Sequence, residues 1–274
     1  MPERALDRVV RGIRSLSGAA LDLVWPPVCP ACGAGMAPGC RERLCAECRS
    51  ELPLISGRAC RRCAMPLGPF EEDNGGRYCV DCGNKSLVFR RAACAGLYEG
   101  PLAETIKSFK YTPRARCMHL AAYLAELLAA SLNRPGCGLE FSEVDVIVPV
   151  PAHRSRRRER GFDSTAEIAR HLARRLNIPL ELRNLVKTCS TRQQMGLARA
   201  ARLENVRDSF KVRRPRRLRN KVVLLVDDVM TTCATAEECA RTLRSADVRE
   251  TRVAAVARAV EGRTVPSGAA AVGG

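Results

Sequence analysis

Residues Val222–Thr235 read VVLLVDDVMTTCAT: five apolar residues, two carboxylates, Asp227 and Asp228, and a short loop rich in hydroxyl groups. The apolar residues are mostly β-branched and uninterrupted, as in a strand that is buried on both faces of a parallel sheet. Helix-forming residues follow from Ala236 to Leu243. The segment therefore predicts a central strand, a turn at its carboxyl end and the start of a helix.

The turn after this strand has the chemistry of an anion site. In open α/β sheets ligands bind beyond the carboxyl ends of strands, where a helix N-terminus offers N–H groups and a positive dipole to a phosphate. Thr231, Thr232 and Thr235 add hydroxyl donors, whereas Asp227 and Asp228 suit sugar hydroxyls or a hydrated Mg²⁺ ion. A buried strand that ends in a solvated acidic pair is the simpler alternative. The P-loop of NTPases is excluded, because the sequence contains no G-x-x-x-x-G-K-[ST] motif.

Cysteine is frequent, with 15 in 274 residues, and eight of them fall in four C-x-x-C pairs. The pairs are Cys29 with Cys32, Cys45 with Cys48, Cys60 with Cys63, and Cys79 with Cys82. Each pair can present two thiolates to one ion, and two pairs complete a closed Cys₄ zinc site, which is structural and not catalytic. Thioredoxin-type redox chemistry needs one C-x-x-C at a helix start after a strand, unlike these loops. We therefore expect two structural zinc ions.

Two pairings of the four C-x-x-C units agree with the sequence. Twelve residues separate Cys32 from Cys45, and fifteen separate Cys63 from Cys79, so sequential pairing would give two compact ribbons. The interleaved alternative joins the first unit to the third and the second to the fourth. Either arrangement would stabilise a segment of about 60 residues that has too few large apolar side chains for a core of its own.

The net charge is +17, from 46 Lys and Arg against 29 Asp and Glu. Such an excess favours polyanionic partners: nucleic acid, phosphorylated small molecules or an anionic membrane surface. Aromatic residues make up only 4% of the chain, so nucleic-acid binding would rest on backbone electrostatics more than on base stacking. Clustered C-x-x-C pairs, without a secretory signal or a membrane-spanning segment in the sequence, predict a cytoplasmic protein.

The two ends of the chain differ from its middle. Residues 1–24 carry apolar side chains at three- and four-residue spacing with Arg largely elsewhere, which predicts an amphipathic helix. Such a helix packs on its own protein or lies on a membrane surface, so peripheral membrane contact stays open. Residues 262–274, rich in Gly and Ala, are expected to form a disordered tail.

Apolar segments alternate with helical ones between these ends. Strands are expected at Val144–Val150, Leu180–Val186, Val222–Val226 and Arg252–Ala257, and helices around Ile106–Tyr111, Arg116–Leu132 and Ser164–Leu176. This alternation predicts an α/β fold with a parallel sheet. The Arg-rich segment Arg154–Arg160 cannot pack in a core, so it is either a solvated loop or a lid that grips phosphate oxygens.

The acidic pair and the Thr-rich loop resemble the signature by which type I phosphoribosyltransferases bind 5-phosphoribosyl 1-pyrophosphate (PRPP). The resemblance implies that Asp227 and Asp228 hold the ribose 2′ and 3′ hydroxyls of Mg²⁺-PRPP. It also implies that the 5′-phosphate is wrapped by Thr231, Thr232, Cys233, Ala234 and Thr235. Cys233 stands where that signature has Gly, which is favoured where φ is positive or the backbone approaches a ligand closely. A Cys fits without strain if its φ is negative.

The order of segments is similar to that of the ComF family over nearly the whole chain. The matching motifs are Trp25-Pro-Pro, Tyr98-Glu-Gly-Pro-Leu with Lys110-Tyr111, Val148-Pro-Val-Pro with Arg160-Gly-Phe, Thr191 with Gln194, and Arg202 with Asn205. The resemblance implies a type I phosphoribosyltransferase-like parallel sheet with flanking helices at residues 87–261, preceded by a small double zinc ribbon at residues 25–86. Asp163 and Ser164 depart from it, because the family usually has Asn-Gln there.

The family also suggests a function. Pyrophosphate would be held by Val150, Pro151, Ala152 and His153, with Arg154 and Arg160 closing over it. The family is linked to natural competence, so single-stranded DNA and DNA-uptake proteins are expected partners. Nothing in the sequence marks an acceptor pocket or a general base. Two hypotheses follow: a phosphoribosyltransferase that transfers from PRPP to an unknown acceptor, and a non-catalytic module that senses PRPP or binds single-stranded DNA.

Overall fold

The computed structural model describes residues 27–37, 40, 42–68, 78–83, 86–112, 114–134, 143–152, 154–188 and 208–260. The expected N-terminal helix at residues 1–24 and the expected tail at 262–274 lie outside these ranges. So do His153 and the motif residues Thr191 to Asn205, while the side chain of Arg154 is also outside the description.

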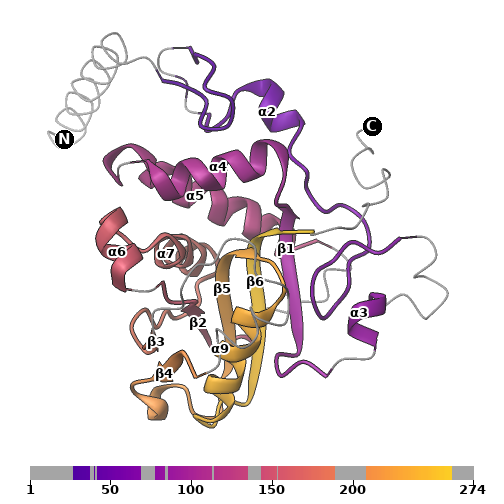
Figure 1. Ribbon diagram of the computed structural model, residues 1–274, viewed down its shortest axis with the longest axis vertical. Coiled ribbons are helices and arrows are strands. Elements are labelled where there is room, and N and C mark those ends of the chain that lie inside the picture. Colours follow the sequence, from indigo (N-terminus) through magenta and orange to yellow (C-terminus); the bar gives the residue numbers. More distant parts are fainter. Residues whose placement is uncertain are drawn as a thin grey trace, which may run out of the picture.

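Four parallel strands form the central sheet, in the order β1-β6-β5-β2 (Figure 1). They are β1 (Arg91–Leu97), β6 (Glu250–Arg258), β5 (Val222–Met230) and β2 (Val146–Pro149). Val226 of β5 pairs with Ala254 on one side and with Pro149 on the other. The predicted α/β fold with a parallel sheet is confirmed, and the apolar run of β5 lies between two neighbouring strands as its sequence indicated.

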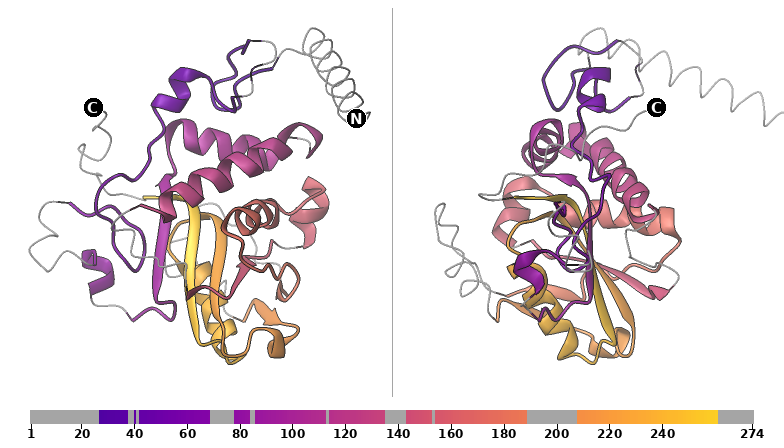
Figure 2. Two further views of the ribbon diagram at one scale, coloured as in Figure 1. Left: turned by 180° about the vertical axis from the view of Figure 1, so that it is seen from behind. Right: turned by 90° about the vertical axis from the view of Figure 1, so that its right-hand side faces the viewer.

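Three helices cover one face of the sheet: α4 (Gly100–Tyr111), α5 (Arg114–Leu132) and α7 (Ser164–Leu176) (Figures 1 and 2). Leu124 and Leu128 of α5 pack with Ile168 of α7 and with Leu224 of β5 in one buried cluster. Helix α7 has the predicted bounds, because the Asp163 side chain caps it by accepting from the Ala166 N–H at 3.2 Å.

The opposite face of the sheet is covered by helix α9 (Ala234–Arg244) together with part of the cysteine-rich segment. Val223 and Leu225 of β5 face this side, since neighbouring residues of a strand point to opposite faces. Cys239 of α9 shares their cluster with Cys60 and Cys63. The second group of cysteines therefore belongs to the same core as the sheet.

The two cysteine-rich ribbons occupy different places. The first, which includes α2 (Ala46–Ser50), forms a separate small cluster that packs against Tyr123 of α5. The second, which includes α3 (Val80–Gly83), packs beside β1 in the main core (Figure 1). The division of the chain at residues 24, 86 and 261 stays a prediction.

The segment between the ribbons closes an edge of the sheet. Ile55 donates its N–H to the carbonyl of Ala95 at 3.0 Å, and Leu97 donates to the carbonyl of Pro53 at 2.8 Å. This pairing covers the outer edge of β1, which would otherwise expose unpaired backbone groups. A Cβ atom at Gly96 would lie only 2.6 Å from the Pro53 carbonyl oxygen, so the approach requires glycine.

Three sequence expectations need correction. Arg154–Arg160 is a helix, α6, and not a loop, because Arg is a good helix former and a short surface helix leaves its side chains in water. Leu180 makes only a single parallel bridge to Ile147. The strand after it is β3 (Leu185–Lys187), which pairs antiparallel with β4 (Phe210–Val212) outside the main sheet.

Two further elements were not expected from the sequence. β1 (Arg91–Leu97) is built mainly from small residues, and its partner β6 is far away in the chain. A short 3₁₀ helix, η3 (Pro215–Arg217), lies before β5, and the following Leu218 is buried. Neither element carries the run of β-branched residues or the helical period on which the sequence prediction relied.

Candidate functional site

The acidic pair lies at the carboxyl end of β5, and Asp228 is buried there by two helices. Lys110 of α4 donates from Nζ to Asp228 Oδ1 at 2.8 Å, and the Ser164 hydroxyl of α7 donates to Oδ2 at 3.4 Å. The Asp228 N–H donates to Asp227 Oδ1 at 2.8 Å. Each carboxylate oxygen has a second lone pair, so the pair can still accept sugar hydroxyls or a hydrated cation.

The two carboxylates are electrostatically linked. Burial, followed by the charge of Asp228, raises the pKa of Asp227 to about 8. Burial lowers the pKa of Lys110, but the charge of Asp228 outweighs it, so the Lys110 pKa is raised and the ammonium stays charged. The site therefore holds the charged Lys110 beside Asp228, and Asp227 binds a proton more tightly than a free carboxyl does.

The loop after the acidic pair leads directly into α9. Thr231 is exposed, Thr232 and Thr235 are half-buried, and Cys233 and Ala234 are buried. The first amides of a helix have no carbonyl one turn earlier to accept them, which makes this turn suited to an anion. The Thr232 hydroxyl already accepts from the Ala234 N–H at 3.4 Å.

Cys233 has the left-handed backbone conformation that favours Gly, the residue of the PRPP signature at this position. Its φ is +66°, whereas a Cys would fit without strain only at a negative φ. Left-handed backbone costs a residue with a Cβ atom about 1 kcal/mol or more. The turn therefore keeps the conformation that Gly would adopt. The backbone of Cys233 is strained, and its side chain is buried in the core.

The expected pyrophosphate loop follows β2, and its backbone amides are already engaged. The Val150 N–H donates to the Val226 carbonyl at 2.8 Å, and Pro151 has no N–H. The Ala152 N–H donates to the carboxylate of Asp163, whose pKa burial raises above its usual value. In the described part of this loop, pyrophosphate would have to displace Asp163 in order to reach a backbone donor.

Arg160 extends away from this loop. Its guanidinium carbon lies 5.2 Å from the centroid of the Tyr111 ring, a cation–π distance that joins α6 to the end of α4. Tyr111 is the most exposed large apolar residue among those described, at 71%. Arg160 and the acidic pair thus border the same end of α4, because Lys110 is the preceding residue.

A large cleft opens beside the expected pyrophosphate loop, between helices α6 and α7 and the β3–β4 hairpin. Its volume is about 1200 Å³. Seven Lys and Arg side chains line it against two acidic ones; the basic residues are Arg157, Arg158, Arg170, Arg183, Lys187, Lys211 and Arg213. Sequence reasoning pointed to α6 alone. The contribution of β3 and β4 was missed, because the two strands are separated by more than twenty residues.

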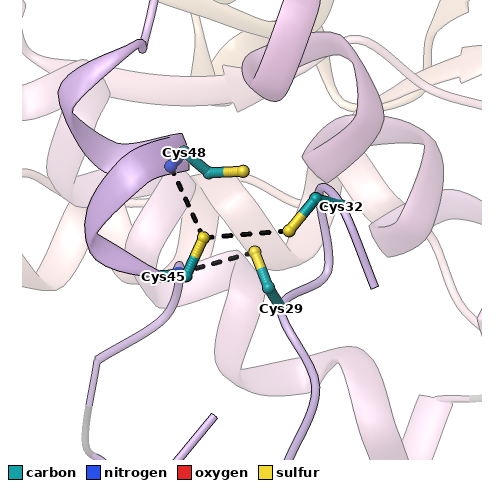
Figure 3. Close-up of side chains that lie close together, drawn as sticks. All are labelled: Cys29, Cys32, Cys45 and Cys48. Atoms are coloured by element: carbon teal, nitrogen blue, oxygen red, sulfur yellow. Dashed lines mark hydrogen bonds between the residues drawn. The ribbon is translucent and has the colours of Figure 1, made fainter. Parts of the chain in front are cut away.

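The eight cysteines form two groups, and the groups follow sequential pairing. Cys29, Cys32, Cys45 and Cys48 form one, and Cys60, Cys63, Cys79 and Cys82 form the other. Within each group all four sulfur atoms lie within 4.8 Å of one another, and Figure 3 shows those of the first group facing a common centre. The interleaved alternative is wrong. Four convergent thiols without another donor fit a closed tetrahedral zinc site.

The thiols of each group interact closely. Hydrogen bonds within the second group lower the pKa of the Cys60 thiol and raise that of the Cys63 thiol. In the first group, the Cys45 N–H donates to Cys29 Sγ and the Cys48 N–H to Cys45 Sγ, both at 3.5 Å. Thiolate is the form that binds metal, so zinc binding would release the protons that remain on each group.

Comparison with known proteins agrees with a cysteine-rich segment that is followed by an α/β sheet. A double zinc ribbon domain matches residues 20–83, and a phosphoribosyl transferase domain matches residues 164–273. Competence protein F of Haemophilus influenzae is 28% identical over 78% of this chain and 96% of its own length. Competence protein ComFC of Bacillus subtilis is 26% identical over 74% of this chain and 78% of its own. The chain is similar to the ComF competence proteins over most of its length.

Another relative is the DNA utilization protein YhgH of Escherichia coli, 26% identical over 81% of this chain and 92% of its own length. The ribbon match includes all eight paired cysteines, and the transferase match includes β5, the acidic pair and the loop up to Thr235. Among the described residues, no helix is long and apolar enough to cross a membrane.

Proposed function

We propose that this chain binds PRPP with Mg²⁺ at the turn between β5 and α9. In this proposal Asp227 and Asp228 bind the ribose hydroxyls and the cation. The 5′-phosphate is bound by the loop Thr231–Thr235. The observation that carries the proposal is the acidic pair near the end of a central parallel strand, with Asp228 buried and Asp227 half-buried, just before a helix N-terminus and inside the segment that matches a phosphoribosyl transferase domain.

The proposed role is in the uptake of DNA, and the names of the two competence relatives support it. If transfer occurs, pyrophosphate leaves C1′ of PRPP, and cations near the β2 end stabilise the departing charge. Arg157 and Arg158 of α6 line the cleft beside that end. The acceptor is a group that enters from this cleft or from the open side next to Tyr111. We place the chain in the cytoplasm, where reducing conditions keep its thiols available for zinc.

Calorimetric titration of purified protein with Mg²⁺-PRPP tests the proposal. Wild-type protein is expected to bind one PRPP per chain, and Asp227→Asn with Asp228→Asn is expected to abolish binding while zinc content and helix content stay unchanged. Asp247→Asn is the matched control, because Asp247 is an exposed acid that pairs with Arg219 away from the turn. Undiminished affinity in the double variant would contradict the site.

Catalysis is tested separately from binding. Release of pyrophosphate from PRPP is measured in the presence of bases, nucleotides and single-stranded DNA, with the double variant as background. Release that depends on one acceptor supports the transferase. Binding without release for every acceptor supports the PRPP sensor, in which Asp163 keeps the Ala152 amide from the departing pyrophosphate.

A second function is favoured by the basic cleft. Seven cations around about 1200 Å³ of open space form a path for the phosphate backbone of single-stranded DNA. Lys211 of β4 and Arg213, which directly follows β4, are exposed and line this path. We propose that the cleft holds the strand by its phosphates, since the chain has few aromatic residues for stacking.

Fluorescence anisotropy with a labelled oligonucleotide tests this second function. Affinity should fall steeply as salt rises from about 50 to about 200 mM, and Lys211→Ala with Arg213→Ala should reduce the logarithmic salt slope by about 1.4 units, or about 0.7 for each cation. Arg216→Ala with Arg219→Ala removes the same charge from exposed positions outside the cleft and serves as the control. Equal losses in the two double variants would contradict a cleft-bound strand.

A further inference from the structure

Arg258, the last residue of β6, lies directly behind the phosphate loop. Its guanidinium is buried, and Nη1 donates to the carbonyl of Met230 at 3.0 Å, to the carbonyl of Thr231 and to that of Ala259 at 2.8 Å. Met230 is the last residue of β5, and Thr231 is the first of the loop. One buried cation therefore holds the start of the loop by its carbonyl oxygens.

These contacts fix the direction of the loop amides. In a trans peptide the C=O and the next N–H point in opposite directions, and no described peptide bond is cis. With the Met230 and Thr231 carbonyls turned toward Arg258, the N–H groups of Thr231 and Thr232 point away from it. A guanidinium on one side of the loop thus aligns backbone donors on the other side, where the 5′-phosphate is proposed to bind.

The other side of Arg258 faces sulfur. The Arg258 side chain is hydrogen-bonded to Cys63, and Cys233 and Cys94 lie close to the guanidinium. Cys63 is a member of the second Cys₄ group, and Cys233 belongs to the phosphate loop. All three cysteines are buried in the same cluster as Met230.

The negative charge of a metal-bound second group and the positive charge of Arg258 would compensate each other. A Zn²⁺ ion with four thiolates carries a net charge of about −2, which is costly to bury without a nearby cation. All four cysteines of the second group are buried, whereas Cys32 of the first group is exposed and Cys45 half-buried. Arg258 supplies the cation at the second group, and the first ribbon packs on α5 at a distance from the loop.

We propose that Arg258 is a positioning residue that couples the second Cys₄ group to the phosphate loop, so that metal in that group and the 5′-phosphate of PRPP bind cooperatively. This inference rests on the proposed PRPP site. The metal-bound thiolates orient the guanidinium, and the guanidinium orients the amides of Thr231 and Thr232. By reciprocity, phosphate in the loop changes the environment of the metal by the same coupling free energy.

Cobalt-substituted protein tests the coupling without relying on activity. Co²⁺ in a Cys₄ site has a thiolate charge-transfer band, and the band is recorded while Mg²⁺-PRPP is added. We expect a saturable change in wild-type protein, with the same midpoint as the calorimetric titration. We expect no change in Arg258→Met, at least tenfold weaker PRPP binding in that variant, and partial recovery of both readouts in Arg258→Lys.

Arg62→Met is the matched control, because Arg62 also lies beside the second group, where Nη1 donates to the Cys82 carbonyl at 2.7 Å and the guanidinium carbon lies 4.5 Å from the centroid of the Tyr78 ring. It should keep both the band change and the affinity. Metal analysis should find two ions per chain in wild-type protein.

The outcomes separate the two proposals. Absence of PRPP binding to the wild-type zinc protein would overturn the proposed function. Normal PRPP binding with an unchanged cobalt band in wild-type protein, or full affinity in Arg258→Met, would overturn the coupling alone. The wild-type arm does not depend on the folding of any variant, so the coupling stays open to contradiction even if Arg258→Met is unstable.

Discussion

Lys110 Nζ lies 2.8 Å from Asp228 Oδ1, although the two residues are 118 positions apart in the chain. The contact joins the end of α4 to the end of β5 and places a buried cation at the base of the proposed ribose site. Because both groups are largely removed from water, each depends on the other for compensation of its charge. The acidic pair is thus held ready for a ligand by a helix outside the segment that carries the PRPP signature.

Loss of Lys110, the partner of Asp228, should destabilise the protein. Lys110→Met leaves Asp228 buried with only the weak Ser164 contact, so we expect the free energy of unfolding to fall by about 3 kcal/mol. Lys107→Met is the control, because Lys107 pairs with Glu104 on the exposed side of the same helix and should cost no more than about 0.5 kcal/mol. Equal losses in urea denaturation would show that the Lys110 contact is not formed.

Asp163 should weaken PRPP binding through its charge. Its carboxylate occupies the Ala152 amide beside the proposed pyrophosphate position. Asp163→Asn keeps an oxygen that can cap α7 and removes the charge, so the affinity for Mg²⁺-PRPP should rise about tenfold. Asp163→Ser, which also keeps a cap, should give a similar gain. Unchanged or weaker binding in both variants would contradict this role.

Strain at Cys233 can be separated from its packing. Cys233→Gly and Cys233→Ala both remove the buried sulfur, but only the Ala variant keeps a Cβ atom at φ +66°. The Gly variant should therefore be more stable than the Ala variant by about 1 kcal/mol in chemical denaturation. An Ala variant as stable as the Gly variant would mean that the loop does not hold this backbone conformation.

The raised pKa of Asp227 predicts a pH dependence of stability. The native carboxyl, with a pKa of about 8, binds a proton more tightly than the unfolded one, with a pKa near 3.8. Its contribution to stability is present at low pH and is lost as pH rises through about 8. Asp227→Asn cannot ionise, so relative to wild type it should gain about 2 kcal/mol between about pH 6 and pH 9. A constant difference across that range would contradict the shift.

The sequence predicted the elements whose side chains repeat regularly. β5 was recognisable because its apolar run is uninterrupted, and α7 because a helical segment follows the Arg-rich one; the cap at Asp163 is seen only in the structure. β1 was not, because Ala, Cys and Gly are poor indicators of a strand. Its pairing with β6 joins Arg91 to Arg252, a distance along the chain that no local pattern can report.

The sequence also predicted the ligands of each site better than their surroundings. The spacing of the C-x-x-C units indicated zinc, and the sequential grouping required the folded positions of the loops. The contacts of Asp228 with Lys110 and Ser164, and of Arg258 with the phosphate loop, join segments brought together only by the sheet. Such contacts leave no periodic signal in a single sequence.

The most direct test of the central claim is a crystal structure of the protein soaked with PRPP and Mg²⁺. The account predicts density for the sugar and its phosphates at the turn between β5 and α9, with the ribose hydroxyls and the cation at Asp227 and Asp228 and the 5′-phosphate on the amides that follow Thr231. An empty turn, together with clear PRPP density elsewhere on the protein, would contradict it.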